Sequence, residues 1–541
     1  MSVFIGYPSF MAYQMMKGKK GNNDGFPSIP GMIARYSALG LTNEQMTENP
    51  VWKDLTGNGH DLQMKNFAWG GMSGVGGYGD ENYQTFYKFP LDDYFFIATP
   101  PGVKHMNFTF RVTGLQPGNK LALAFFGTTN TIYGTWNKDG IYTVDADIVE
   151  AGKPTYFYNG YGATRGEFTI EILPLYPGFI LGDGLDDFAV TEKELNFEDT
   201  YTVYTAFIPF QNNPTRNMIL CGADSKKTFS MQYSSLVYVS FIAGNNYYIN
   251  ADFVNGLNLF ACKRNGNNIC IKNLLTNKVV TGTCGDWVEN AGLYYLWKNA
   301  TYASFARTAI AGQTICNGYF STDEDDEKVL NWYKKQYPWL FPDQAWTVTG
   351  KTNQDEDRAT IANITGNGND LILSNFGFAE GSGYNEQGEY EGYLVTDGVD
   401  DEIISAKLIQ FADKFTIVGD WKFMEDRGDN AGLLKSNQIY IYNATTGMRI
   451  YLKQGSKNYP FSCKKINALT SDGWVYDEKW DKYKVYPIGS DIDISNRLFL
   501  GFYGSNFTKI ALKNLGIYNN QLLSKDDCIK AYNYLQTLKA K

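Results

Sequence analysis

The chain has 541 residues and a formal net charge of −9 at pH 7, which is long enough for three or four domains of about 100–200 residues each. The acidic balance argues against a duplex-DNA binder, which needs a concentrated basic surface. The only two histidines, His60 and His105, exclude a zinc site built from three histidines. Aromatic residues make up 16 % of the chain, so the fold has to bury or present many rings.

The first residues do not resemble an export signal. Apolar residues come first and a cluster of three lysines, Lys17, Lys19 and Lys20, follows them, whereas a secretory signal has its positive charge before the apolar stretch. No apolar run approaches the roughly 18–20 residues that cross a bilayer. We therefore expect synthesis in a cytoplasm without export by the general pathway, and no membrane insertion. Residues 1–29 predict an attachment arm that docks onto a partner or a neighbouring subunit, with a frayed tail as the alternative.

Two landmarks occur twice in the chain. Residues 56–62 (TGNGHDL) return as residues 365–371 (TGNGNDL), an offset of 365 − 56 = 309. Residues 179–187 (FILGDGLDD) return as residues 393–401 (YLVTDGVDD), an offset of 397 − 183 = 214. Because 309 − 214 = 95, the first copy carries about 95 additional residues between its landmarks, which we interpret as an inserted domain.

The inserted stretch, residues 89–174, has strand signals of its own. Apolar and polar residues alternate in two segments, with the apolar positions at Phe108, Phe110, Val112 and at Phe168, Ile170, Ile172. This period of two is typical of half-buried strands, and Gly-rich turns separate the segments. The stretch therefore predicts a small β-sandwich.

Each copy ends in a predicted helix. The first follows Ser321 and Thr322 and begins with four acidic residues, with Lys334 and Lys335 near its far end, an order that suits the helix dipole. Pro338 and Pro342 end it and mark the hinge to the second copy. The last helix follows Ser524, with acids at 526 and 527 and an apolar face formed by Ile529, Tyr532 and Leu535.

Short apolar segments separated by Gly, Asn and Asp fill the rest of both copies, a pattern typical of sandwiches and jelly rolls. We predict an all-β chain with two large jelly-roll sandwiches, each ending in a short helix. The first comprises residues 30–88 and 175–340 and is interrupted by the small inserted sandwich, and the second comprises residues 346–541. The seven cysteines contain no CxxC pair and their number is odd, so we expect mostly buried free thiols. One or two disulfides among the five cysteines in the range 221–316 are left open.

These motifs resemble a known family. The stretch from Asp54 to Leu62, its weaker copy from Asn363 to Leu371, the D-G-x-D-D strand ends and the closing helices are similar to laminin-G-like, concanavalin A-like lectin and glucanase sandwiches. This resemblance implies two facing antiparallel sheets and, in many members, carbohydrate binding. The start of the chain and the duplicated domains also resemble virion proteins of phages that infect Bacteroidales, including head-fibre or tail proteins of crAss-like phages.

The repeated polar motifs have a structural and a functional interpretation. The TGNGxDL segments suit either a ligand loop or a tight turn, and the exchange of His60 for Asn369 between the copies favours the turn. Six aspartates in the two DGxDD segments suit either turns that bond local amides or calcium sites: Asp183, Asp186, Asp187, Asp397, Asp400 and Asp401. We favour the turns, with calcium as the alternative cofactor.

Aromatic residues are the better candidates for sugar binding, because sugar rings stack on flat aromatic faces. The candidates lie in two Gly-containing segments: Trp69, Tyr78, Tyr156, Tyr158 and Tyr161. Packing of sandwich rims or of a subunit interface is the alternative role. The E-x-D-x-E pattern of the family's glucanases is absent from both copies, so we expect no catalytic residues and no enzyme activity.

Together these features predict a structural bacteriophage virion protein: a head fibre, tail fibre or decoration subunit. It attaches to capsid or tail proteins by its N-terminal region, forms a homo-oligomer, expected to be a trimer, binds no nucleic acid, and either touches host-surface glycans or is purely architectural. The alternative is a bacterial surface carbohydrate-binding protein or glycoside hydrolase. That alternative predicts an export signal and a pair of acids within one large sandwich, and neither is visible.

Overall fold

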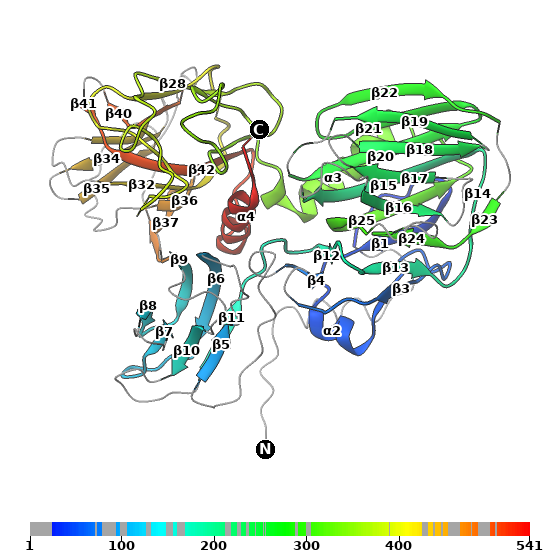
Figure 1. Cartoon of the computed structure of the whole chain (residues 1–541), viewed down its shortest axis with the longest axis horizontal. Helices are drawn as coiled ribbons and strands as arrows, with labels where there is room; N and C mark the ends of the chain where they lie inside the picture. The colour runs from blue at the N-terminus through cyan, green and yellow to red at the C-terminus, as the bar shows by residue number, and fades with distance from the viewer. Residues whose placement is uncertain are drawn as a thin grey trace. The chain divides into compact units, whose positions relative to one another are not determined.

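The computed structural model (Figure 1) is mostly β, with 46 % of the residues in strands. It describes residues 24–70, 73–77, 94–97, 105–125, 131–147, 155–159, 168–210, 218–223, 229–233, 237–243, 245–252, 254, 256–286, 290–298, 305–388, 390–409, 411–424, 431–435, 439–444, 447–452, 466–477, 479–484, 498–503 and 506–540. The predicted all-β class is confirmed. Among the described residues, no helix is long and apolar enough to cross a membrane.

The chain divides into two compact units. The first comprises Met1–Phe108, Leu115–Asn137 and Val144–Gln336, and the second comprises Thr109–Gly114, Lys138–Thr143 and Tyr337–Lys541.

The first large sandwich consists of two eight-stranded antiparallel sheets. One has the order β22 (Lys278–Thr283), β21 (Asn268–Asn273), β20 (Asn258–Asn265), β15 (Thr200–Pro209), β25 (Arg307–Asn317), β12 (Ile180–Asp183) and β4 (Gly74–Val75), with β1 (Met32–Ser37) also paired to β25. The other has the order β19 (Asn245–Ala251), β18 (Val237–Ala243), β17 (Phe229–Tyr233), β16 (Met218–Ala223), β24 (Tyr294–Leu296), β13 (Phe188–Thr191), β3 (Leu62–Lys65) and β2 (Val51–Trp52), and β14 (Leu195–Phe197) pairs separately with β23 (Asn290–Gly292). The core lies between the two sheets and takes Tyr201 and Phe260 from one and Trp52 and Leu296 from the other.

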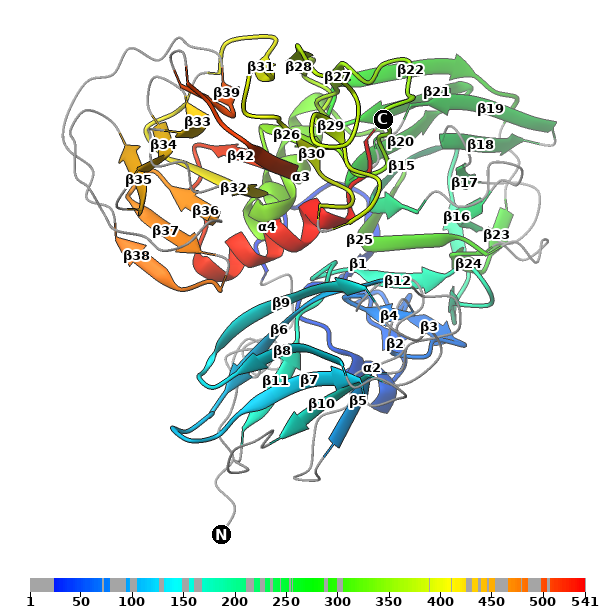
Figure 2. The same cartoon turned by 60° about the vertical axis from the view of Figure 1, so that its left-hand side comes forward.

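The second large sandwich repeats this arrangement. Its first sheet has the order β29 (Gly383–Tyr384), β30 (Leu394–Val395), β42 (Ile510–Asn519), β32 (Phe415–Phe423), β36 (Ile466–Thr470), β37 (Trp474–Asp477) and β38 (Lys482–Lys484), with β26 (Gln344–Thr347) also paired to β42. Its second sheet has the order β27 (Thr360–Ile361), β28 (Leu371–Ser374), β31 (Glu402–Ser405), β39 (Phe499–Leu500), β33 (Ala431–Lys435), β34 (Ile439–Ala444) and β35 (Gly447–Leu452), next to a separate pair, β40 (Phe502–Tyr503) and β41 (Asn506–Phe507). Helix α4 (Lys525–Thr537) packs against β32 and β42 (Figure 2).

The inserted stretch forms two small sheets, as its alternating pattern predicts. One has the order β5 (Tyr94–Ile97), β10 (Thr155–Asn159), β7 (Leu121–Phe125) and β8 (Thr131–Trp136), and the other has the order β11 (Thr169–Ile172), β6 (His105–Thr113) and β9 (Gly140–Asp147). The rings of Phe108 and Phe157 meet edge to face across the two sheets, with their centroids 6.2 Å apart. The predicted boundaries of this domain, residues 89 and 174, remain predictions.

A β-bulge identifies equivalent residues in the two large sandwiches. The pairing of β15 with β25 shifts register between Ala206 and Phe207, and the pairing of β32 with β42 shifts between Asp420 and Trp421. Ala206 is therefore equivalent to Asp420, an offset of 420 − 206 = 214 that matches the DGxDD motifs. Bulges are specific local features, so the duplication read from short motifs extends through the central strands.

Both predicted closing helices are present, with their predicted caps. Helix α3 (Asp323–Gln336) begins after Thr322, whose hydroxyl accepts the Asp325 N–H at 3.2 Å. Helix α4 begins after Ser524, whose hydroxyl accepts the Asp527 N–H at 3.1 Å. A short 3₁₀ helix, η1 (Pro338–Leu340), follows α3 where the prolines predict its end. The sequence interpretation missed α2 (Asn43–Glu48), which a Thr42–Gln45 capping box starts.

Residues 24–29 of the predicted arm pack against the first sandwich. Asp24 forms an ion pair with the buried Arg35, and its carbonyl accepts the Trp332 Nε1–H of α3 at 3.2 Å. Phe26 is buried, and its ring meets that of Trp332 edge to face at 5.0 Å. These six residues therefore form part of the packed structure, and residues 1–23 lie outside the described residues.

Five cysteines have described side chains, and all five are free thiols: Cys262, Cys270, Cys284, Cys316 and Cys528. Four of them are buried and Cys270 is half-buried. The expected free, mostly buried thiols are confirmed for these positions.

Candidate functional site

The first TGNGxDL segment is a turn whose polar groups bond one another. The buried Asp54 accepts hydrogen bonds through Oδ1 from the N–H and hydroxyl of Thr56, at 2.9 and 2.7 Å, and through Oδ2 from the His60 N–H at 3.2 Å. The Asn58 amide donates to the Ile33 carbonyl at 2.9 Å. These side chains hold the loop on strand β1.

The second copy builds the same turn with partly different residues. Asn363 replaces Asp54 and accepts the N–H and hydroxyl of Thr365 at 3.0 and 2.7 Å. The Tyr36 hydroxyl donates to the His60 carbonyl at 2.6 Å, and the Trp346 Nε1–H donates to the Asn369 carbonyl at 2.8 Å. The shared partner is a backbone carbonyl, which explains why His and Asn exchange at this position. Burial lowers the pKa of His60, which favours the neutral imidazole.

The DGxDD segments are also turns in both copies. The Asp183 N–H donates to Oδ2 of Asp187 at 2.9 Å, and Oδ1 of Asp183 accepts the Leu185 N–H at 2.7 Å. In the second copy the Asp397 N–H donates to Oδ2 of Asp401 at 2.7 Å. This is the arrangement of an Asx turn closed by a buried carboxylate.

The predicted calcium ligands do gather, three in each turn. One carboxylate oxygen from each of Asp183, Asp186 and Asp187 lies within 4.8 Å of the others, and Asp397, Asp400 and Asp401 repeat the group. Backbone N–H groups already use oxygens of the first and last residue of each trio, and calcium prefers six to eight oxygen ligands. The fit to a cation is therefore partial, and calcium at these turns remains a prediction.

Burial changes the protonation of the turn aspartates. It is the main cause that raises the pKa of Asp187 to about 7 and that of Asp401 to about 6, and the neighbouring carboxylates of each trio add to it. Unfolded aspartates titrate near a pKa of about 3.9. The folded chain therefore holds protons at pH values where the unfolded chain has lost them.

Stability should consequently rise as the pH is lowered from about 8 to about 5, since the contribution of these protons is lost as the pH rises through the two folded-state pKa values. The double substitution D187N/D401N should flatten this dependence, because the neutral amide does not titrate. The measurement is the thermal unfolding midpoint against pH, with EDTA present to exclude metal. Equal pH slopes for the variant and the wild type would contradict the assignment.

The predicted aromatic candidates are only partly described. Trp69 is half-buried, and its ring stacks on Phe67 with the centroids 5.0 Å apart, so one face of the indole is covered. The ring of Phe378, its equivalent in the second copy, is tilted against that of Phe376, with the centroids 5.9 Å apart. Tyr158 is half-buried on β10. The side chain of Tyr156 lies outside the described residues, as do Tyr78 and Tyr161.

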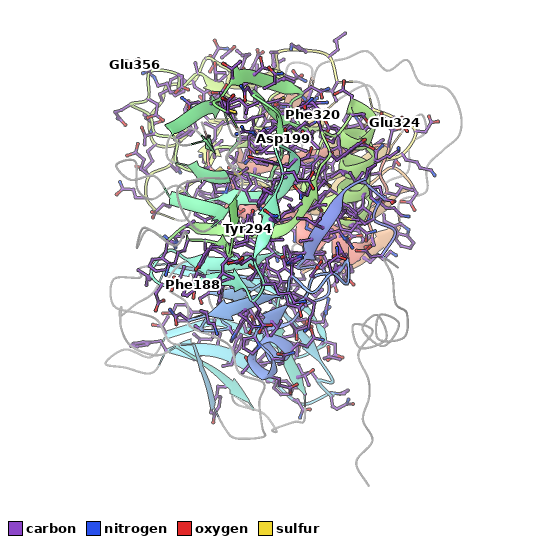
Figure 3. The ribbon with its side chains drawn as sticks, turned by 90° about the vertical axis from the view of Figure 1, so that its right-hand side faces the viewer. Phe188, Asp199, Tyr294, Phe320, Glu324 and Glu356 are labelled. Atoms are coloured by element: carbon purple, nitrogen blue, oxygen red, sulfur yellow. The ribbon has the colours of Figure 1, made fainter. Side chains whose placement is uncertain are left out.

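A different group of rings lies on the outer face of a first-sandwich sheet (Figure 3, where Phe188 is labelled). On β13, Ala189 belongs to the core, so its half-buried neighbour Phe188 faces away from the core. Tyr295 lies between the core residues of β24 and faces outward in the same way. The Phe188 centroid is 6.5 Å from that of Tyr295 and 6.4 Å from that of Phe305.

Two lysines flank these rings. The Lys298 Nζ lies 4.3 Å from the Phe188 centroid and 5.4 Å from the Phe305 centroid. Lys65, which is exposed, pairs directly with Phe188 across β3 and β13. We call Lys65, Phe188, Tyr295, Lys298 and Phe305 the aromatic–lysine face. The sequence interpretation missed it because its members come from four segments; only the outward alternation after the DGLDD turn could have pointed to Phe188.

No family model matches this chain, and no curated protein matches it. Among solved structures it is similar to the binding domain of botulinum neurotoxin DC in complex with SialylT, with 9 % identity over 62 % of this chain and 87 % of that chain and a TM-score of 0.25. The receptor binding domain of botulinum neurotoxin mosaic serotype C/D has 8 % identity over 64 % and 88 % and a TM-score of 0.28. The VIP36 exoplasmic/lumenal domain, in its Ca2+/Man3GlcNAc-bound form, has 8 % identity over 29 % and 86 % and a TM-score of 0.21. These likenesses are too distant to transfer a ligand to this chain.

Proposed function

We propose that this chain is a non-catalytic, carbohydrate-binding structural protein of a bacteriophage virion, either a head fibre, a tail fibre or a decoration subunit. The observation that carries carbohydrate binding is the cluster of half-exposed rings at Phe188, Tyr295 and Phe305 on the outer face of a sheet. Apolar faces of sugar rings stack on such aromatic side chains. Two of the three rings stand on paired strands, which fix their positions better than a loop would.

The non-catalytic part of the proposal is supported by the use of the repeated acids. Asp54, Asp187 and Asp401 accept backbone N–H groups inside turns, so their carboxylates stabilise the chain's own conformation. A glycosidase needs instead two carboxyl groups about 5–9.5 Å apart across a scissile bond. In this proposal the repeated motifs therefore stabilise the fold, and the rings of Phe188, Tyr295 and Phe305 contact the ligand.

The virion part of the proposal is supported by the resemblance of the duplicated sequence to phage head-fibre and tail proteins. A symmetric oligomer would multiply weak sugar contacts, because linked sites raise the effective affinity without new contacts. Synthesis in the host cytoplasm followed by assembly into the particle is the corresponding location.

Two experiments test the proposal. A glycan array probed with the full chain should show binding, and the substitutions F188A and Y295A should weaken it, while V279A, an exposed control on β22, should not. Mass spectrometry of purified phage particles should detect the chain. An array without any binding would overturn the carbohydrate role, and absence of the chain from intact particles would overturn the virion role.

A further inference from the structure

The aromatic–lysine face carries positive charge on an acidic protein. The chain as a whole has a net charge of −9, yet Lys65 and Lys298 both lie beside Phe188. In the described part of the chain, neither ammonium group has a carboxylate within ion-pair distance. Several other lysines do form ion pairs with acids, such as Lys53 with Asp61 and Lys278 with Asp252.

The geometry places one of these charges in a defined position. The Lys298 Nζ lies over Phe188 and near Phe305, whose rings are 6.4 Å apart. The negative faces of aromatic rings attract an ammonium group at this distance. A lysine held in this way loses less side-chain freedom when a ligand binds, which lowers the cost of ordering it.

The second sandwich shows that the scaffold does not require this face. The equivalent cross-strand pair there is Ser374 with Glu402, in place of Lys65 with Phe188. Phe502 occupies the position of Lys298, since Leu296 and Leu500 pair with equivalent residues of β13 and β31. At these three positions one copy thus carries a serine, a glutamate and a phenylalanine, and the other carries two lysines around a phenylalanine.

We infer that the aromatic–lysine face binds an anionic glycan, a chain of sugar rings that carry carboxylate or sulfate groups. This inference rests on the proposed function and specifies its ligand class. The rings of Phe188 and Tyr295 supply apolar contact with the sugar, and the ammonium groups of Lys65 and Lys298 attract its anionic substituents. A purely neutral glycan would make no use of the two lysines.

The exposed carboxylate of the DGLDD turn opposes this attraction, so its removal should change binding in the direction opposite to the lysine substitutions. Asp186 is exposed and lies two residues before Phe188 in the DGLDD turn. Its carboxylate repels an anionic ligand, so the substitution D186N should strengthen binding to an anionic glycan. A role of the lysines in packing alone would not predict this gain.

The experiment measures binding of the full chain to three immobilised polysaccharides: polygalacturonate with carboxylates, dextran sulfate with sulfates, and unmodified dextran. The wild type should bind at least one anionic polymer more tightly than dextran, and binding should weaken as NaCl is raised. The variant K65Q/K298Q should lose about 2- to 30-fold in affinity for the anionic polymer, because that is the usual contribution of two ion pairs at a protein surface. D186N should gain affinity.

The control variant K334Q/K335Q removes the same two charges from the exposed side of α3, and should bind like the wild type. F188E installs the residue that the second sandwich has at this position, so the fold should tolerate it, and its thermal unfolding should stay near that of the wild type while binding is lost.

Equal losses in K65Q/K298Q and K334Q/K335Q, or no loss in either, would overturn the inference. If neutral glycans bind and F188E abolishes that binding while the lysine variants do not change it, the ligand class is wrong but the proposed function stands. If no glycan binds on the array or here, both fail. Tighter binding of single-stranded oligothymidylate at the same lysines would assign the face to nucleic acid and overturn the inference.

Discussion

Replacing Asp326 with alanine should destabilise the first sandwich by about 3–5 kcal/mol, the usual cost of leaving a buried charge without its partner. Asp326 is 2 % exposed. Its carboxylate lies 2.8 Å from the Lys263 Nζ and 3.0 Å from the Lys272 Nζ, and it accepts the Tyr204 hydroxyl at 2.9 Å. The substitution would leave the ammonium of Lys263 buried with the Ser321 carbonyl as its remaining described hydrogen-bond partner.

Asp323 provides the matched control, because it contacts the same network from the surface. Its carboxylate is 2.6 Å from the Lys272 Nζ, but its side chain is 92 % exposed. The nearby ammonium lowers the pKa of Asp323, and solvent screens most of that attraction. D323A should therefore unfold close to the wild type.

Hydrogen exchange of the full chain, read at peptides from β20 and α3, measures both variants without separating the units. D326A should exchange faster in these peptides, while peptides from β32 and α4 keep the rates of the wild type. Similar effects for D326A and D323A would mean that the buried ion pairs contribute no more than surface ones.

The sequence predicted the elements around this network but missed the network itself. Helix α3 begins where its cap and its acids indicate. Acids in a first helical turn suit the helix dipole whether they are exposed or buried, and the burial of Asp326 is decided by Lys263, which lies 326 − 263 = 63 residues away on β20. Local patterns do not contain such long-range pairings.

At the candidate site, too, features encoded in short segments were predictable from the sequence, and features that depend on long-range pairing were not. The exchange of His60 for Asn369 was sufficient to favour a turn, because several of the hydrogen bonds of this turn join residues within the short repeated motif. The aromatic–lysine face depends on the register of β3, β13 and β24. Lys65 and Phe188 are 188 − 65 = 123 residues apart, with the inserted domain between them, so no sequence window holds both.

The largest coupling between substitutions should occur at Gly182 and Trp297 in the first sandwich. A Cβ atom on Gly182 would lie 2.4 Å from Cδ1 of Trp297, and the fully buried indole donates to the Thr308 carbonyl at 2.9 Å. G182T should therefore overpack the site and cost about 1–3 kcal/mol. W297G should leave a cavity and lower the free energy of unfolding by about 3–5 kcal/mol. The relief of backbone strain offsets part of this loss, because φ at this residue is 63°, a value that glycine adopts without strain.

The second sandwich contains the reciprocal pair, which indicates how the two losses compensate. Thr396 occupies the position of Gly182, and its hydroxyl donates to the Thr508 carbonyl at 2.6 Å and accepts the Ile510 N–H at 2.9 Å. Gly501 occupies the position of Trp297, with φ of 75°. The double variant G182T/W297G should thus be more stable than the sum of the single losses predicts, by about 1–3 kcal/mol. Denaturant unfolding of the wild type, the two single variants and the double variant measures this coupling. If the losses of the single variants simply add, the Thr–Gly pair of the second sandwich cannot replace the Gly–Trp pair of the first.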